Sequence, residues 1–111
     1  MDGIVEKTLL FDFYGALLTA HQRTLYEDVT FNDMSLSEAA EVYGISRQGV
    51  HDILKRSESA LREYEEKLQL IRQYENMKKL LSGIRTELSL EAPKRETLLS
   101  LLDSLEGEIE R

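Results

Sequence analysis

The segment from Ser35 to Leu54 constrains the fold of this chain more than any other part of the sequence. Ser35 followed by Glu38 is a capping-box pattern, which satisfies free backbone donors at the start of a helix. Gly44 stands where that helix must end, because glycine adopts the left-handed conformation of a helix C-terminus without steric penalty. Ser46 is placed to cap a second helix. The segment therefore predicts a helix-turn-helix, in which the second helix has the form that enters a DNA major groove.

The apolar residues of the segment support the same prediction, because they recur at three- and four-residue spacing on one face of each helix. Ile45 falls in the turn, where it would pack into the core. An ordinary helical hairpin can also carry caps and a glycine turn, but the ordered agreement of seven positions favours the helix-turn-helix. The predicted inward residues are Leu36, Ala39, Ala40 and Tyr43 in the first helix, and Val50, Ile53 and Leu54 in the second.

The charge of the chain restricts how it could bind nucleic acid. The net charge is −7, and residues 1–43 hold eight acidic against two basic side chains. Residues 44–62 reverse this balance, with four basic side chains against two acidic ones, and residues 63–111 return to eleven acidic against eight basic. Contacts with phosphate dominate nucleic-acid affinity. We therefore predict weak, strongly salt-dependent binding per subunit, through the second motif helix and its continuation.

Length and composition indicate one cytoplasmic domain over residues 1–111. The chain has 111 residues and no cysteine, which is compatible with a reducing compartment. No apolar run approaches the length of a membrane span, and Asp2 with Glu6 argues against a signal peptide, so no membrane association is expected.

The rest of the sequence predicts an all-α fold. Hydrophobic periodicity predicts a helix over residues 5–18 and another over residues 20–28, capped by Thr19. The second motif helix meets no strong breaker before Ser82 and Gly83, so it is predicted to be long, and Pro93 marks the start of a C-terminal helix. We expect a helix-turn-helix core in residues 1–57, followed by the long helix and the C-terminal helix in residues 58–111.

The long helix carries an apolar stripe with the 4-3 spacing of a coiled coil. A four-helix core cannot cover its far end, so the stripe needs either the C-terminal helix or another subunit. We predict a homodimer, with the C-terminal helix either folded back or crossing to the partner. The predicted dimerisation residues are Leu54, Leu61, Tyr64, Leu68 and Ile71.

No pattern in the sequence indicates catalysis. His21 and His51 are the only histidines, without the spacing of a metal site. Ser46, His51 and Asp52 contain the letters of a hydrolase triad, but their spacing on one helix does not bring them together. We therefore expect no enzyme activity, no catalytic residue, no cofactor and no metal.

Several segments resemble known proteins. Residues 36–41, together with Gly44-Ile45-Ser46, Val50 and residues 54–56, resemble region four of sigma-seventy-type factors, a four-helix module that reads the minus-thirty-five promoter element. Nearly the whole chain to Leu81 resembles the YlxM family of small bacterial proteins. The segments that carry this resemblance are residues 10–14, 17–19, 22–23, 46–52 and 63–68.

The YlxM resemblance implies an all-helical cytoplasmic protein with a sigma-region-four-like domain and a regulatory role in the signal recognition particle pathway. That role rests on the position of the family's genes beside those of the particle's GTPase or its receptor. The family usually has proline where this chain has Ala20, which affects only the pre-set start of the second helix. Residues 26–33 are more acidic than a promoter-reading module favours, which puts phosphate contact by that helix in doubt.

Three functions follow from these observations. The first is sequence-specific DNA binding, because arginine and glutamine are the usual readers of guanine and adenine edges. The second is an adaptor that binds the RNA or the protein components of the particle, its GTPase or its receptor, with the acidic faces as contacts. The third is a structural dimer whose reading helix no longer binds. The predicted nucleic-acid-binding residues are Ser46, Arg47, Gln48, His51, Lys55 and Arg56.

Overall fold

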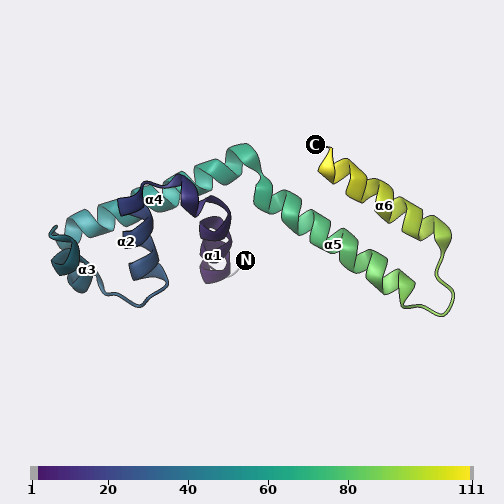
Figure 1. Ribbon diagram of the computed structural model, residues 1–111, viewed down its shortest axis with the longest axis horizontal. Coiled ribbons are helices and arrows are strands. Elements are labelled where there is room, and N and C mark those ends of the chain that lie inside the picture. The colour runs from purple at the N-terminus through teal and green to yellow at the C-terminus, as the bar shows by residue number, and fades with distance from the viewer. Residues whose placement is uncertain (1–2, 111) are drawn as a thin grey trace. The chain divides into compact units, whose positions relative to one another are not determined.

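The computed structural model describes residues 3–110, and these fold into helices joined by short loops (Figure 1). The all-α prediction is confirmed. The elements in chain order are α1 (Gly3–Tyr14), the short 3-10 helix η1 (Gly15–Leu17), α2 (Ala20–Thr30), α3 (Leu36–Tyr43), α4 (Arg47–Leu68), α5 (Leu70–Leu88) and α6 (Arg95–Ile109). None of these helices is both long and apolar enough to cross a membrane.

The chain divides into two compact units, one ending at Gln69 and the other beginning at Leu70. In the first unit α1, α2 and α3 each pack against α4, and in the second α5 and α6 lie side by side as an antiparallel hairpin (Figure 1). The boundary predicted between residues 57 and 58 differs from this division, because the helix that carries the recognition segment continues for three more turns within the first unit.

The core of the first unit is the predicted helix-turn-helix core. Leu25, Ala39 and Val50 are fully buried at its centre, one from each of α2, α3 and α4. Ala39 is small, so the α3 backbone can approach its neighbours closely. The partly buried side chains around this centre are Val29, Met34, Leu36, Ala40, Tyr43, Ile45, Ile53 and Leu54.

The predicted helix ends are confirmed at Thr19, Ser35, Gly44 and Ser46. The Ser35 hydroxyl accepts from the Glu38 backbone, and the Glu38 carboxylate accepts from the Ser35 backbone, as a capping box requires. Thr19 and Gln22 form a second capping box at the start of α2. Gly44 ends α3 in the left-handed conformation, with φ 66°.

The single long helix predicted from Ser46 is wrong, because α4 ends at Leu68 and Gln69 adopts a left-handed conformation with φ 54°. The amide N–H of Gln69 still closes the last turn of α4, at 2.8 Å from the Glu65 carbonyl oxygen. The apolar spacing continues past Gln69, but the apolar side chains of the two helices pack against different partners. The stripe of α4 faces α1, α2 and α3, whereas α5 pairs with α6.

Two other helix boundaries differ from prediction. The N-terminal helix ends at Tyr14 and continues only as the turn of η1. The C-terminal helix begins at Arg95, after Lys94 in an extended conformation, so Pro93 belongs to the preceding loop and not to the first turn. The backbone N–H of Lys94 instead donates to the Glu87 carboxylate at the end of α5.

Candidate nucleic-acid interface

The buried side chains of α4 determine which side of the helix faces solvent. Val50, Ser57 and Leu61 are fully buried on one side. Each residue turns a helix by about 100°, so Gln48 and Lys55 point to the opposite side. The core of the first unit thereby fixes which polar side chains of α4 meet solvent.

The start of α4 is held by Ser46. Its side-chain oxygen accepts from the Gly49 backbone N–H at 2.9 Å, so part of its hydrogen-bonding capacity goes to the helix cap. The hydroxyl hydrogen stays available, and the N-terminus of a helix favours an anion such as phosphate. The structure thus places Ser46 at the end of the outward face and gives it a structural role as the cap of α4.

The six predicted nucleic-acid-binding residues are all exposed, and the structure brings them together along the first three turns of α4. Arg47 and Gln48 occupy the first turn, His51 the second, and Lys55 and Arg56 the third. The arrangement gives a strip of donors on one helix surface, as a major-groove reader needs.

Asp52 lies in the middle of this strip and was not among the predicted site residues. Its carboxylate accepts from the Gln48 side-chain amide at 3.0 Å and lies 3.9 Å from Nδ1 of His51. This bond orients the Gln48 amide through one of its two donor hydrogens. Asp52 also lines an open hollow of about 520 Å³ with Lys55, Arg56 and Ser59, so a carboxylate and two cations share one surface.

Lys7 is a second residue that the sequence did not single out. It lies on α1 and lines an open groove of about 650 Å³ together with His51 and Lys55 of α4. Val29 and Leu54 give the groove part of its apolar lining, and Glu58 supplies a carboxylate. Forty-four residues separate Lys7 from His51, so only the packing of α1 on α4 places them at one site.

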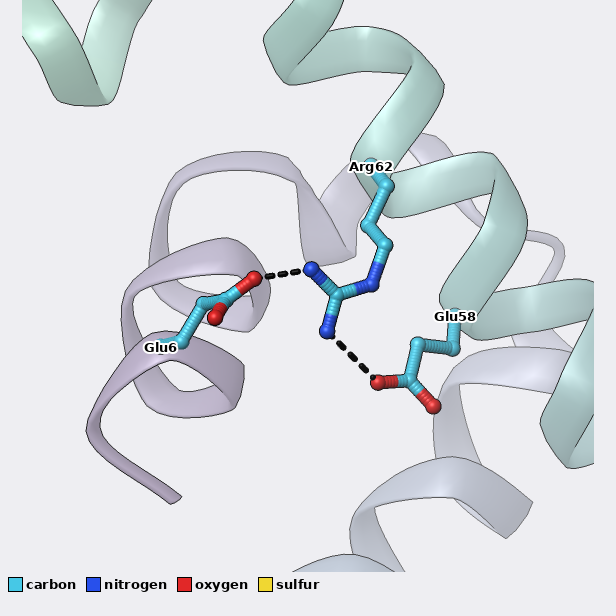
Figure 2. Close-up of polar contacts among 3 residues, drawn as sticks. All are labelled: Glu6, Glu58 and Arg62. Carbon is cyan, nitrogen blue, oxygen red and sulfur yellow. Dashed lines mark hydrogen bonds and ion pairs between the residues drawn. The ribbon is translucent and has the colours of Figure 1, made fainter. Parts of the chain in front are cut away.

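Arg62 clamps α1 to α4 beside this groove (Figure 2). Its guanidinium pairs with Glu6 of α1 and with Glu58 one turn earlier on α4, the latter at 3.0 Å. The hydrogen bonds that Arg62 donates to the Glu6 and Glu58 carboxylates raise the pKa of Arg62 further above its usual value. Because one guanidinium serves two carboxylates, this group keeps one net negative charge beside Lys7 and Lys55 of the groove.

Asp28 on α2 is also committed to the fold. The Tyr43 hydroxyl donates to its carboxylate at 2.6 Å, and the Asn32 amide donates to the other oxygen at 3.2 Å. The hydrogen bond to Asp28 raises the pKa of Tyr43 to about 12. This carboxylate in the acidic residues 26–33 therefore joins α2 to α3.

The five predicted dimerisation residues do not form one exposed stripe. Leu61 is fully buried, and Leu54 is partly buried in the helix-turn-helix core. The ring of Tyr64 lies 6.1 Å from that of Tyr14 on α1. Leu68 is 53% exposed, and Ile71 is buried beyond the break at Gln69. Side chains covered within their own unit cannot also pack in a seam with a second copy.

Comparison with known proteins agrees with this architecture. The model of a family described as "Putative helix-turn-helix protein, YlxM / p13 like" matches residues 1–101. A UPF0122 protein of a Thermoanaerobacter species is 42% identical over 111 residues, covering 98% of this chain and 95% of the relative. Relatives of the same name are 40% identical over 106 residues in Halalkalibacterium halodurans, covering 96% of each chain, and 43% identical over 106 residues in Bacillus pumilus, covering 92% of this chain and 96% of the relative.

The helix-turn-helix at α3 and α4, the match over residues 1–101 and relatives of about 40% identity over most of both chains lead to one conclusion. The chain belongs to UPF0122, the family of YlxM / p13-like helix-turn-helix proteins.

Proposed function

We propose that this protein is a cytoplasmic, non-enzymatic DNA-binding regulator that acts as a homodimer and is linked to the signal recognition particle pathway. The strip of exposed donors on the first three turns of α4 carries the DNA-binding part of the proposal. The link to the particle rests on the resemblance to the YlxM family, and the homodimer on apolar side chains left exposed outside the helix-turn-helix core.

In the proposed complex, the N-terminal part of α4 enters the major groove. Arg47 and Gln48 read base edges, since bidentate contacts to guanine and adenine suit these side chains. Ser46 and the backbone donors around it hold a phosphate. His51, Lys55 and Arg56 contact neighbouring bases or phosphates, and Lys7 reaches the backbone from α1. Asp52 limits the affinity, because a carboxylate on this surface repels phosphate.

The alternative is an adaptor that binds the particle's RNA, its GTPase or its receptor without reading DNA. The excess of acid in residues 1–43 favours it, since eight carboxylates against two bases suit a basic protein surface better than a duplex. Here the helix-turn-helix serves as a scaffold, and charge reversals on α2 and α3 would weaken binding more than changes on α4.

A salt-titrated binding assay tests the proposal, with purified protein, duplex DNA of varied sequence and the particle's RNA side by side. Sequence-selective DNA binding that weakens steeply with salt is the expected result. Arg47→Ala should lower the binding free energy for the preferred duplex by about 1–3 kcal/mol and reduce selectivity. Arg95→Ala removes the same charge from α6 and serves as the matched control. RNA binding alone, or binding to neither, would exclude the DNA-binding proposal.

A further inference from the structure

The α5–α6 hairpin leaves a large share of its apolar side chains exposed. Among the described residues of this unit, α5 buries only Ile71 and α6 buries none. A segment of about 40 residues normally needs a further partner, a metal or disulfides to stay folded. The exposed apolar residues of the two helices are Leu81 (53% exposed), Leu88 (59%), Leu99 (53%), Leu102 (48%) and Ile109 (62%), together with Leu70 (41%) and Tyr74 (42%) near the start of α5.

These leucines and the isoleucine lie on one side of the hairpin. The row of α5 that faces α6 is known from its contacts. Gln73 and Asn76 donate to Glu108, and Gly83 lies against Leu101. At about 100° per residue, Leu81 and Leu88 lie about a third of a turn from that row.

On α6, Leu102 and Ile109 lie about a quarter of a turn from Leu101, in the same rotational sense, and Leu99 lies farther round, toward the outer edge. Because the helices are antiparallel, this places the apolar rows of both helices on the same side. We call this surface the apolar face: Leu81, Leu88, Leu99, Leu102 and Ile109. The opposite side carries Lys79 and Thr86 of α5 and Ser100 and Ser104 of α6.

The charges beside the apolar face differ between the two helices. The residues of α5 include four basic and two acidic side chains, whereas those of α6 include one basic and four acidic. Lys78 and Arg85 fall along the outer edge of α5, and Asp103 and Glu106 along the outer edge of α6, by the same rotation of about 100° per residue. All four side chains are exposed. The apolar face is therefore bordered by a basic edge on one helix and an acidic edge on the other.

We propose that the apolar face binds the same face of a second copy of this chain, so that two hairpins form a four-helix bundle with α5 of one copy over α6 of the other. A two-fold axis along the helices brings the basic edge of α5 beside the acidic edge of the partner's α6, twice in the dimer. The other face-to-face arrangement stacks α5 on α5 and places like charges together. The bundle keeps neighbouring helices antiparallel and buries apolar rows from both copies. This inference rests on the proposed homodimer and not on DNA binding.

The first test measures molecular mass in solution by light scattering, with the full chain. The wild-type protein should have twice the chain mass. Leu81→Glu with Leu102→Glu should give the monomer mass, because it buries carboxylates in the bundle. Thr86→Glu with Ser104→Glu adds the same two charges to the opposite side of the same helices and should stay dimeric. A monomeric wild type would overturn the proposal, whether the face is covered by the rest of the chain or by another protein, and a dimeric Leu81→Glu/Leu102→Glu variant would place the interface elsewhere.

A charge-exchange experiment covers the case in which the apolar variant unfolds, since it changes only exposed edges. Lys78→Glu with Arg85→Glu makes both edges acidic, and Asp103→Lys with Glu106→Lys makes both basic. Each variant alone should self-associate at least tenfold more weakly than wild type, and an equimolar mixture should recover dimers that contain one chain of each. Failure of the mixture to favour mixed dimers would exclude the α5-over-α6 arrangement. The readouts are mass and chain composition, so a protein that does not bind DNA can still give the expected result.

Discussion

Asp52 is a single residue with opposing effects on the outward face of α4. Its carboxylate positions Gln48, and it places a negative charge among the side chains that would meet phosphate. The sequence shows the residue type but not this pairing, since an exposed acid next to His51 is usually only solvated. Its role depends on the i, i+4 geometry of α4 and on which face the core leaves outside.

We expect Asp52→Asn to strengthen binding to non-specific duplex DNA by about threefold to tenfold, because it removes a repulsive charge and keeps the shape of the side chain. Binding titrations at two salt concentrations measure the effect. Glu91→Gln, in the loop between α5 and α6, removes the same charge away from both proposed interfaces and should leave affinity unchanged. Weaker and less selective binding by Asp52→Asn would instead indicate that Asp52 accepts a hydrogen bond from cytosine.

Tyr26 predicts a pH dependence of stability. Its side chain is almost fully buried, and burial raises its pKa to about 12. The nearby Thr30 side chain lowers the pKa of Tyr26 and so offsets part of that rise. The two hydroxyl groups do not, however, form a hydrogen bond of good geometry. The unfolded chain loses this proton near pH 10, whereas the folded chain keeps it to about pH 12. The contribution of Tyr26 is therefore complete below about pH 10 and is lost as the pH rises to about 12.

Tyr26→Phe should remove this contribution to the pH dependence. Its free energy of unfolding should equal or exceed that of wild type near neutral pH, since the hydroxyl has no hydrogen-bond partner among the described residues. Between about pH 10 and 12 it should fall less steeply with pH than that of wild type. Denaturant titrations at several pH values provide the measurement, and identical slopes for the two proteins would refute the assignment to Tyr26.

At the scale of helices and turns, predictions succeeded at the side-chain caps and at the glycine turn, but not at Pro93, which lies in the loop before α6. The capping box of Ser35 and Glu38, the left-handed Gly44 and the Ser46 cap each depend on residues within one turn. The break at Gln69 has no such signal, because glutamine rarely adopts positive φ and the apolar spacing continues past it. Two further contacts depend on the packing of separate helices and could not be predicted from spacing. Lys7 and His51 line one groove, and the Tyr43 hydroxyl donates to Asp28.

Glycine-to-alanine changes should have opposite effects at two helix positions. Gly44→Ala should lower the free energy of unfolding by about 1–2 kcal/mol, because φ of 66° is unfavourable for a residue with a Cβ atom. No atom lies within 4 Å of the added carbon, so the effect reports the backbone alone. Gly107→Ala, inside α6 and equally unobstructed, should stabilise α6 by about 0.5–1 kcal/mol. Thermal and denaturant unfolding measure both changes, and a neutral Gly44→Ala would mean that the turn relaxes.

At the scale of the whole molecule, the two units differ in how much they bury. The first unit holds a core with contributions from α2, α3 and α4, reinforced by α1 through Tyr14, whose hydroxyl donates to Glu65 at 2.5 Å. The second is a hairpin in which, among the described residues of its two helices, only Ile71 is buried. The sequence correctly indicated an apolar stripe that needs a partner, but the prediction placed this stripe mainly on α4. The packing of the α4 apolar residues against α1, α2 and α3 could not be seen from the spacing alone.

A fragment of residues 1–69 should therefore fold alone as a monomer with a cooperative transition, whereas the full chain should show a transition whose midpoint depends on protein concentration. Circular dichroism and light scattering on both proteins test this. A fragment that is unfolded would mean that the second unit is needed for the helix-turn-helix core. A dimeric fragment would mean that the dimer interface lies in the first unit, as the sequence predicted for α4.

The left-handed Gln69 has a consequence for how the chain can change over evolutionary time. In one continuous helix, every inserted or deleted residue rotates all that follows by about 100°, so length changes in one half would alter which side chains the other half presents. Because Gln69 ends the helical phase of α4, residues can be gained or lost in α5 and α6 without re-aiming Arg47 or Gln48. The two halves can therefore diverge in length, or be exchanged for other modules, at this single residue.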